Sequence, residues 1–433
     1  MRSQNNSLKK KKCYVVDTSL LLHDPKAISV LGEHADIVLP RSVISDLGRL
    51  EKSRIFDASF TAGEALSEIE RLRGDHPKFN GGLPINLKHK LIVYGLPQSA
   101  VGKADSMSQI VGVCQLPKLT KEYSPIVISK DKALRLMVAS HDIHTEDYEY
   151  DAVESIYQGI EYVDADLVGT DQLTDEQRIA NRFFISNSKK IQVFAHGKLQ
   201  MLEKNGKDKF NFHGIMPRNR EQVAALWALV NPDIQFVSLQ GKAGCGKTLL
   251  ALVAGVQDLV SNEPMYEKII ITRAMESVDG KDLGALPGSA EDKISPYMDG
   301  VWDNLETIKR HMEIINSTAK GKASDTKIFG FENQIIPVPF DLMRGRSLSK
   351  TLLIIDEAQN ISAHAMKTLL TRIDDSSKVV IMGDNDQIDH PYLDSRSNGM
   401  VRAINHFKGY PKAAHITLIS NERGDVSSFA SKM

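Results

Sequence analysis

Residues 236–260, FVSLQGKAGCGKTLLALVAGVQDLV, decide the fold of the second half of this 433-residue chain. An apolar segment that reads as a strand is followed by a glycine-rich turn and then by a segment with helical apolar spacing. The turn, residues 241–248, matches GxxxxGK[ST] at every fixed position. Such turns curl their N–H groups around phosphate oxygens, and the positive end of the next helix favours the same anion. These residues predict a nucleotide phosphate site in a doubly wound α/β sheet.

The predicted phosphate loop consists of Gly241, Lys242, Ala243, Gly244, Cys245, Gly246, Lys247 and Thr248. Lys247 would reach the β- and γ-phosphates, and the Thr248 hydroxyl would ligate Mg²⁺. A chance match is the alternative, but a second motif argues against it. Residues 351–355 form an apolar strand that ends at Asp356 and Glu357. The first carboxylate can hold Mg²⁺ and the second can polarise water, so the two motifs predict Mg²⁺-assisted ATP hydrolysis.

A third strand, residues 379–383, ends in the polar cluster that contains Asp384 and Gln387. At the carboxyl edge of a parallel sheet these two side chains could sense the γ-phosphate. A simple capping turn is the other interpretation, and the sequence leaves both open. Several arginines are candidates for stabilising the transferring phosphoryl group, although each is more ordinarily a surface or ion-pair residue. They are Arg273, Arg344, Arg346, Arg372 and Arg423.

The first half of the chain alternates strand-like and helix-like segments, which predicts a second parallel sheet with covering helices. Its expected strands are residues 13–16, 37–40 and 126–129, and residues 75–88 read as a loop. Residues 151–214 change in pattern, with short β-like pieces at 191–195 and 198–202. We therefore expect an α/β domain over 13–150, a small and β-rich connecting module over 151–214, and the P-loop domain over 215–433.

Composition narrows the class of protein. Apolar residues make up 42% and charged residues 25%, as in ordinary globular proteins, and the net charge of -1 gives no argument for a nucleic-acid partner. The three cysteines lie far apart, which favours free thiols in a reducing cytoplasm over disulfides or zinc. No run of 18 apolar residues exists, so we expect no membrane span and a cytoplasmic location.

The second half resembles the PhoH-like ATPases, a family similar to the RecA-like core of superfamily-one helicases. The motifs that carry the likeness are GIMPRNREQ at 214–222, the P-loop, ALPG at 285–288, MRGRS at 343–347, DEAQN at 356–360 and GDNDQ at 383–387. The resemblance implies that Gln222 contacts adenine and that Asp356 and Glu357 act on Mg²⁺ and water. It also implies that Arg423 is an arginine finger, although Gly424 stands where the family usually has serine.

Four aspartates stand at predicted strand or helix edges in the first half: Asp17, Asp46, Asp105 and Asp131. From position alone they are equally compatible with helix caps and surface charges. The segments YVVDTSLLLHDP at 14–25, VISDL at 43–47 and VISKDKALR at 127–135 resemble PIN-domain nucleases fused to a PhoH-like ATPase. The resemblance implies that the four aspartates bind Mg²⁺ or Mn²⁺. Asp105 departs from the family pattern because it lies five residues before Ile110, where three are usual.

Together these likenesses imply a metal-dependent ribonuclease joined to an ATP-driven RNA helicase, with RNA as the partner. They also imply a homo-oligomer, of which a hexameric ring is one form, because an arginine finger commonly serves a neighbour's ATP. Two alternatives stay open. The PIN domain could bind RNA or a protein without cleavage, or the chain could be a nucleotide-dependent regulatory switch, since both need the same phosphate site.

Overall fold

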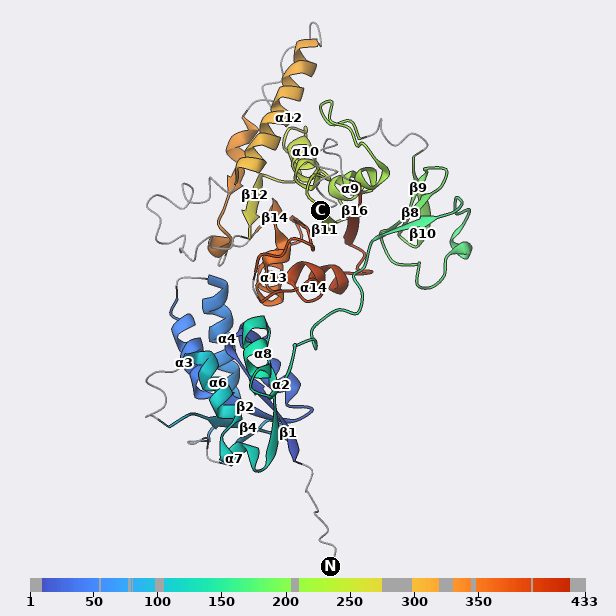
Figure 1. Cartoon of the computed structure of the whole chain (residues 1–433). Helices are drawn as coiled ribbons and strands as arrows, with labels where there is room; N and C mark the ends of the chain where they lie inside the picture. Colours follow the sequence, from blue (N-terminus) through green and yellow to red (C-terminus); the bar gives the residue numbers. More distant parts are fainter. Residues whose placement is uncertain are drawn as a thin grey trace, which may run out of the picture. The chain divides into compact units, whose positions relative to one another are not determined.

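The structure is a computed structural model that describes residues 10–53, 56–76, 79, 81–97, 105–203, 210–274, 298–318, 330–343, 348–390 and 392–420. The chain forms two compact units (Figure 1): the first runs to Ala152 and also includes residues 391–393, and the second contains the rest of the chain from Val153. No helix in these ranges is long and apolar enough to cross a membrane.

The first unit is built on a six-stranded sheet of order β3-β4-β2-β1-β5-β6. All neighbouring pairs are parallel except β3 with β4. The strands are β1 (Lys11–Val16), β2 (Asp36–Pro40), β3 (Leu83–Pro84), β4 (Lys90–Tyr94), β5 (Tyr123–Ile128) and β6 (His144–Glu146). The expected parallel sheet is confirmed, but β3 lies inside a stretch that the glycines and prolines had indicated as loop. The register pairs Val16 with Ile128, so the residues after β1 and β5 meet at one edge.

Helices surround this sheet and bury its apolar side chains in one core, which includes Leu20, Val38 and Val127. The helices are α1 (Thr18–His23), α2 (Ala27–Leu31), α3 (Arg41–Leu50), α4 (Phe56–Arg73), α6 (Ser106–Cys114), α7 (Pro117–Thr120) and α8 (Lys132–Ala139). Three of the four candidate aspartates are N-caps, because their carboxylates accept the first free N–H groups of α1, α6 and α8.

The second unit opens with a small sheet of order β10-β9-β8-β7. Its strands are β7 (Ile160–Val163), β8 (Arg182–Ser186), β9 (Ile191–Ala195) and β10 (Lys198–Glu203). The short β-like pieces that the sequence indicated are therefore strands. The small sheet shares a hydrophobic core with the sheet that follows, and Phe183 packs edge-on against Trp227 with ring centroids 5.6 Å apart.

The main sheet of the second unit has six strands, all parallel, in the order β13-β12-β14-β15-β11-β16. They are β11 (Phe236–Gly241), β12 (Lys268–Arg273), β13 (Ile335–Pro337), β14 (Thr351–Asp356), β15 (Lys378–Gly383) and β16 (Ala413–Leu418). The chain leaves β11 toward β12 on one side and adds β16 on the other. Such a switch in strand order is where doubly wound sheets bind ligands.

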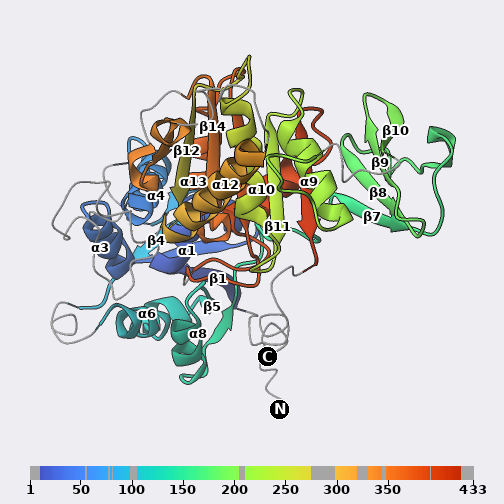
Figure 2. The ribbon, with the colours of Figure 1, turned by 90° about the horizontal axis from the view of Figure 1, so that it is seen from above.

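Helices cover both faces of this sheet, as can be followed in Figure 2. They are α9 (Arg220–Val230), α10 (Lys247–Leu259), α12 (Asp299–Thr318), α13 (Ala363–Leu370) and α14 (Gly399–His406). Val237 and Ile354 share a core with α9, α10 and α12, whereas Phe236 and Ile355 share one with α13 and α14. Strand neighbours thus point to opposite faces, as a sheet buried on both sides requires. The predicted P-loop architecture is confirmed.

Candidate functional sites

The phosphate loop connects β11 to α10 as the motif predicts. Gly244 and Gly246 have φ of +89° and +91°, a left-handed conformation that glycine adopts without strain. Gly246 is also the N-cap of α10, so the free N–H groups of the first helical turn face the loop. Lys242 and Ala243 are exposed at the mouth of the loop, and Cys245 is buried below it, where burial raises the pKa of its thiol.

Lys247 folds back over its own loop. Its ammonium donates to the carbonyl oxygens of Gly241 and Lys242, the latter at 3.1 Å, and lies 3.8 Å from the sulfur of Cys245. The charge is therefore held at the place where the helix N-terminus also attracts an anion. A phosphate that enters the loop would exchange these neutral carbonyl contacts for charged ones, which are stronger.

Gln222 lies beneath the loop and is almost fully buried. Its amide nitrogen donates to the Cys245 carbonyl at 3.1 Å, and its amide oxygen accepts from the Arg218 N–H at 2.7 Å. This side chain ties the start of α9 to the phosphate loop. The adenine contact that the family resemblance implies for Gln222 stays a prediction.

The carboxylate motif ends β14, which β15 separates from the strand that carries the phosphate loop. Burial, and next the neighbouring Glu357, raise the pKa of Asp356 to about 6, while Arg273 and Lys247 act in the opposite direction. Because β11, β15 and β14 are parallel, the phosphate loop and the carboxylate motif follow strand ends at the same edge of the sheet. Glu357 adopts φ 52° and ψ 39°, a strained conformation for a residue with a side chain, of the kind found at active sites.

Two neighbours orient the side chain of Glu357. Arg273, the last residue of β12, pairs with one carboxylate oxygen at 3.0 Å. Gln359 donates to the other oxygen at 2.7 Å and to the Gln387 carbonyl at 2.8 Å, and it accepts from the Asp384 N–H at 3.1 Å. The fully buried Gln359 therefore joins the ends of β14 and β15. Gln359 lies within the DEAQN motif, and its role depends on contacts that the motif alone does not reveal.

The strand-end cluster after β15 contains a capping turn, one of the two interpretations that the sequence allowed. The Asp384 carboxylate accepts from the Asp386 N–H at 3.1 Å and from the Gln387 side chain. Asp386 reaches the phosphate loop instead, because its carboxylate lies 3.7 Å from the Lys242 ammonium. A role for Asp384 and Gln387 in sensing the γ-phosphate stays a prediction.

The residues of this site fit a magnesium nucleotide. Thr248 in the first turn of α10 offers a hydroxyl, and Asp356 offers a half-buried carboxylate. Both are the hard oxygen donors that Mg²⁺ takes, and Mg²⁺ usually keeps only one or two protein ligands beside water and phosphate.

The arginine candidates divide by position. Arg273 is at the site, in its ion pair with Glu357. Arg372 is not, because its carbonyl accepts the Leu348 N–H, just before the opposite, amino end of β14. Arg344, Arg346 and Arg423 lie outside the described residues, as does the motif at 285–288. The arginine finger and the oligomeric ring that would need it therefore stay predictions.

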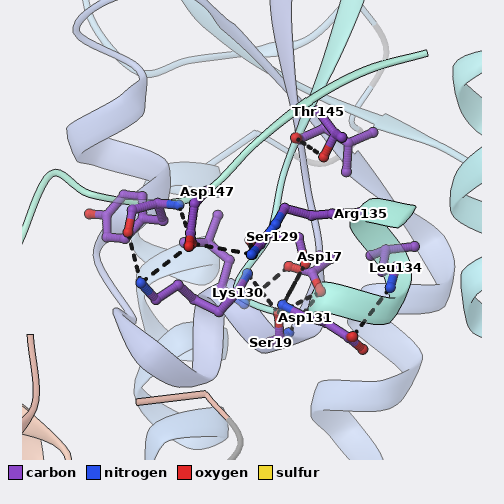
Figure 3. Close-up of polar contacts among 12 residues, drawn as sticks. Asp17, Ser19, Ser129, Lys130, Asp131, Leu134, Arg135, Thr145 and Asp147 are labelled. Carbon is purple, nitrogen blue, oxygen red and sulfur yellow. Dashed lines mark hydrogen bonds and ion pairs between the residues drawn. The ribbon is translucent and has the colours of Figure 1, made fainter. Parts of the chain in front are cut away.

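In the first unit, Asp17 and Asp131 approach each other through Ser19 (Figure 3). The buried Asp17 carboxylate accepts from the Ser19 hydroxyl at 2.7 Å and from the Leu20 N–H at 3.1 Å, and burial raises its pKa. The same hydroxyl oxygen accepts the N–H of Lys130 at 3.1 Å and of Asp131 at 3.0 Å. One serine thus uses its full hydrogen-bonding capacity to hold the starts of α1 and α8 together.

Asp46 faces the same hollow from α3, and Asp105 does not. The hollow is lined by Asp17, Asp46, Asp131 and the Ser106 hydroxyl, among others. Asp46 accepts from Ser106 and pairs with Arg49. Asp105 is exposed and caps α6, where the hydrogen bonds from Ser108 lower its pKa.

The chemistry of the lining suits a divalent cation, since carboxylate and hydroxyl oxygens are what Mg²⁺ and Mn²⁺ prefer. Arg49 would compete with such a cation for Asp46. Among the residues that the structure describes, no three His, Cys, Asp or Glu side chains come close enough to share one ion. The donor types are therefore in place, and binding would require Asp46 to exchange Arg49 for metal.

A second set of charges braces the turn that carries Asp131 (Figure 3). The buried Lys130 ammonium donates to the Tyr148 carbonyl at 2.9 Å and lies 3.4 Å from the Asp147 carboxylate. Arg135 donates to the Ser129 carbonyl at 2.6 Å and also contacts Asp147, at 3.3 Å. These roles could not be predicted from the sequence, although Lys130 and Arg135 lie within the VISKDKALR segment at 127–135.

Comparisons with known proteins identify the family of each half of the chain. Residues 14–149 match the model of the PIN domain, and residues 214–426 match that of the PhoH-like protein family. The chain is 33% identical to Protein PhoH2 of Bacillus subtilis over 98% of this chain and 99% of that protein. It is 31% identical to Protein PhoH2 of Thermobispora bispora over 98% and 96%, and 33% identical to Protein PhoH of Escherichia coli K12 over 41% and 46%. The chain belongs to the PhoH2 family, which joins a PIN domain to a PhoH-like ATPase domain.

Proposed function

We propose that this protein hydrolyses ATP at its P-loop and uses the energy to unwind RNA that the PIN domain cleaves with a divalent cation. One observation carries the ATPase part of the proposal. Lys247 follows β11, the adjacent Asp356 and Glu357 follow β14, and these strand ends lie at one edge of the main sheet, with Glu357 held by both Arg273 and Gln359.

The residues divide the work of hydrolysis between them. The loop N–H groups and Lys247 bind the β- and γ-phosphates, and Glu357 orients the water that attacks the γ-phosphorus as the bond to the β-phosphate oxygen breaks. Thr248 and Asp356 would hold Mg²⁺, which neutralises charge on the phosphates. Arg273 and Gln359 keep the Glu357 carboxylate in place, and such positioning is a large part of catalysis in phosphoryl transfer.

The nuclease part rests on the hollow that Asp17, Asp46 and Asp131 line. In metal-assisted hydrolysis, water attacks the phosphodiester phosphorus, one P–O bond breaks and the leaving oxygen takes a proton. The cation supplies the activated water, and these aspartates would hold that cation. RNA as substrate comes from the resemblance to PIN domains.

A second function is favoured by two observations at the same hollow. Asp105 does not line it, and Arg49 pairs with Asp46. A PIN domain in this arrangement would bind RNA or a protein partner without cutting it. The ATPase could then serve as a motor or as a nucleotide-dependent switch.

One experiment separates these functions. Cleavage of unstructured and of hairpin RNA is measured with Mn²⁺, with and without ATP, at fixed free metal because ATP chelates the cation. Opening base pairs requires about 1.4 kcal/mol per step, so ATP should accelerate cleavage of the hairpin far more than cleavage of the unstructured strand. Lys247→Ala should abolish that difference. Absence of all cleavage would favour the binding-only function, and equal rates with and without ATP would contradict coupling.

A further inference from the structure

A hollow lies at the amino-end edge of the PIN sheet, opposite to the edge that carries Asp17 and Asp131. Because β1, β2, β4 and β5 are parallel, their first residues share this edge (Figure 1). The hollow has a volume of about 660 Å³ and is lined by those strand starts together with the loop before β4. It belongs to the PIN unit alone, and neither the ATPase site nor the aspartate hollow uses it.

Positive charge gathers around this hollow, which we call the basic hollow. Its lysines are Lys10, Lys11, Lys88, Lys90 and Lys121. Its acidic residues are Asp36 and Glu122, and the local formal charge is therefore +3 when His89 is taken as neutral. The whole chain carries a formal charge of -1. Within the described part of the chain, none of the five ammonium groups forms an ion pair with a carboxylate.

The floor of the basic hollow is fixed by Asp36, the buried first residue of β2. Its carboxylate accepts the Lys90 N–H at 3.0 Å and the Tyr123 hydroxyl at 2.7 Å, and it lies 3.5 Å from the His89 ring. The Asp36 carboxylate is therefore occupied by these contacts, which connect the starts of β2, β4 and β5. Around it Lys10, Lys11, Lys88 and Lys121 are exposed, and Lys90 is half-buried.

The loop before β4 is equally well held. The Asn86 side chain accepts the N–H groups of Lys88 and His89 at 2.8 and 2.9 Å, and it donates to the Gly32 carbonyl at 2.8 Å. The loop presents Leu87 fully exposed beside Lys88. An apolar side chain among unpaired cations suits a ligand that carries both phosphate charge and an apolar surface, such as a base or ribose.

We propose that the basic hollow binds the phosphate backbone of single-stranded RNA, as a contact separate from the aspartate hollow. This inference rests on the proposed action on RNA. Four strand starts span three spacings of about 4.8 Å, roughly 14 Å in all, which is wide enough for successive phosphates rather than one. Lysines are point charges without the fork that reads base edges, so the contact would be independent of sequence.

The basic hollow and the aspartate hollow carry opposite charges, and this difference explains why RNA would need the basic hollow as an additional contact. Without metal, the aspartate hollow repels a phosphate, because its three carboxylates outnumber Arg49. Affinity for the backbone must then come from cations elsewhere, and counterion release at lysines supplies it.

The test measures RNA binding by the full chain with fluorescence anisotropy, using a labelled uridine dodecamer in EDTA and without ATP. Lys88→Gln/Lys121→Gln removes two charges from the basic hollow. Lys26→Gln/Lys198→Gln removes two exposed charges elsewhere and is the matched control. Each contact on a single strand contributes a salt slope of about 0.7, so the first variant should bind roughly 20-fold more weakly at 0.1 M salt, with a slope shallower by about 1.4. The control should stay within twofold.

The possible failures are distinguishable. If wild-type protein binds the dodecamer and both double variants bind it equally, the basic hollow is not an RNA site, while the proposed function stands. If wild-type protein does not bind the dodecamer in EDTA, the inference fails, and the RNA part of the proposed function, which requires the cation and ATP, is decided by the cleavage experiment instead. If labelled polyglutamate binds in a way that depends on Lys88 and Lys121 while RNA does not, the hollow docks a protein and the inference is wrong.

Discussion

Replacing Gln359 by leucine should lower both the free energy of unfolding of the ATPase domain and the kcat for ATP hydrolysis. Gln359 is fully buried and joins Glu357, Gln387 and Asp384 through three hydrogen bonds. Leucine has nearly the same volume, so the substitution removes these bonds without opening a large cavity. Glu357 would then be held by Arg273 alone.

The expected magnitudes follow from what is left unpaired. The Gln387 carbonyl and the buried Asp384 N–H each lose a partner, at about 1–3 kcal/mol each, so the free energy of unfolding should fall by about 2–6 kcal/mol. A misplacement of the order of 1 Å at a catalytic group can lower a rate about 100-fold, and we expect kcat for ATP to fall 10- to 100-fold. The Kd for ATP should change less than threefold, because among the described residues Gln359 bonds to Glu357, Gln387 and Asp384 rather than to the phosphate loop.

Gln192→Leu is the matched control. Gln192 is also buried and exchanges two hydrogen bonds with the backbone of Leu167, at 2.7 and 2.9 Å, in the small sheet away from the nucleotide site. Urea unfolding should show both variants destabilised, and steady-state phosphate release should show kcat reduced only in Gln359→Leu. A kcat within twofold of wild type for Gln359→Leu, or an equal loss in the control, would refute the positioning role.

Three further predictions concern the rest of the chain. Asp17→Asn should lower Mn²⁺-dependent RNA cleavage at least 100-fold, measured on gels, while ATP hydrolysis is unchanged; full cleavage by this variant would place the nuclease site elsewhere. Asp105→Asn should lower cleavage less than tenfold, because this carboxylate is exposed and outside the aspartate hollow, and a loss equal to that of Asp17→Asn would contradict this placement. Burial lowers the pKa of His415 to about 3, against about 6.5 when unfolded. Below pH 6.5, and down to about pH 3, the unfolded chain therefore binds a proton that the folded chain does not. In this range His415 should lower the free energy of unfolding by about 1.4 kcal/mol for each unit that the pH falls. In urea unfolding, His415→Gln should flatten that decline, and an unchanged pH dependence would exclude His415 as its cause.

Local sequence determined much of this picture. The P-loop needs glycines at fixed spacing between a strand and a helix, so its position and its left-handed residues could be read directly. The carboxylates after β1 and β5 in the first sheet, and after β14 in the main sheet of the second unit, could also be placed. In each sheet, parallel strands bring their carboxyl ends to the same edge. In the connecting module, β9 and β10 could be recognised as short β-like segments, whereas β7 and β8 were not predicted.

Contacts between distant side chains could not be read from the sequence. The pairing of Arg273 with Glu357 depends on β12 lying beside β14, and the role of Gln359 depends on β15 lying on the other side. Asp105 was expected at the aspartate hollow, but the start of α6 turns its neighbour Ser106 inward instead. The basic hollow could not be predicted from the sequence either, because only the pairing of β1, β2, β4 and β5 brings lysines from three parts of the chain together.

The central claim, ATP hydrolysis at the P-loop, is tested most directly by comparing three proteins for ATP binding and for phosphate release. Wild type should do both, Lys247→Ala should do neither, and Glu357→Gln should bind ATP with near-normal affinity but release phosphate at least 100-fold more slowly. ATP turnover by Lys247→Ala at the wild-type rate would contradict the assignment of the site, and normal turnover by Glu357→Gln would contradict the role of its carboxylate.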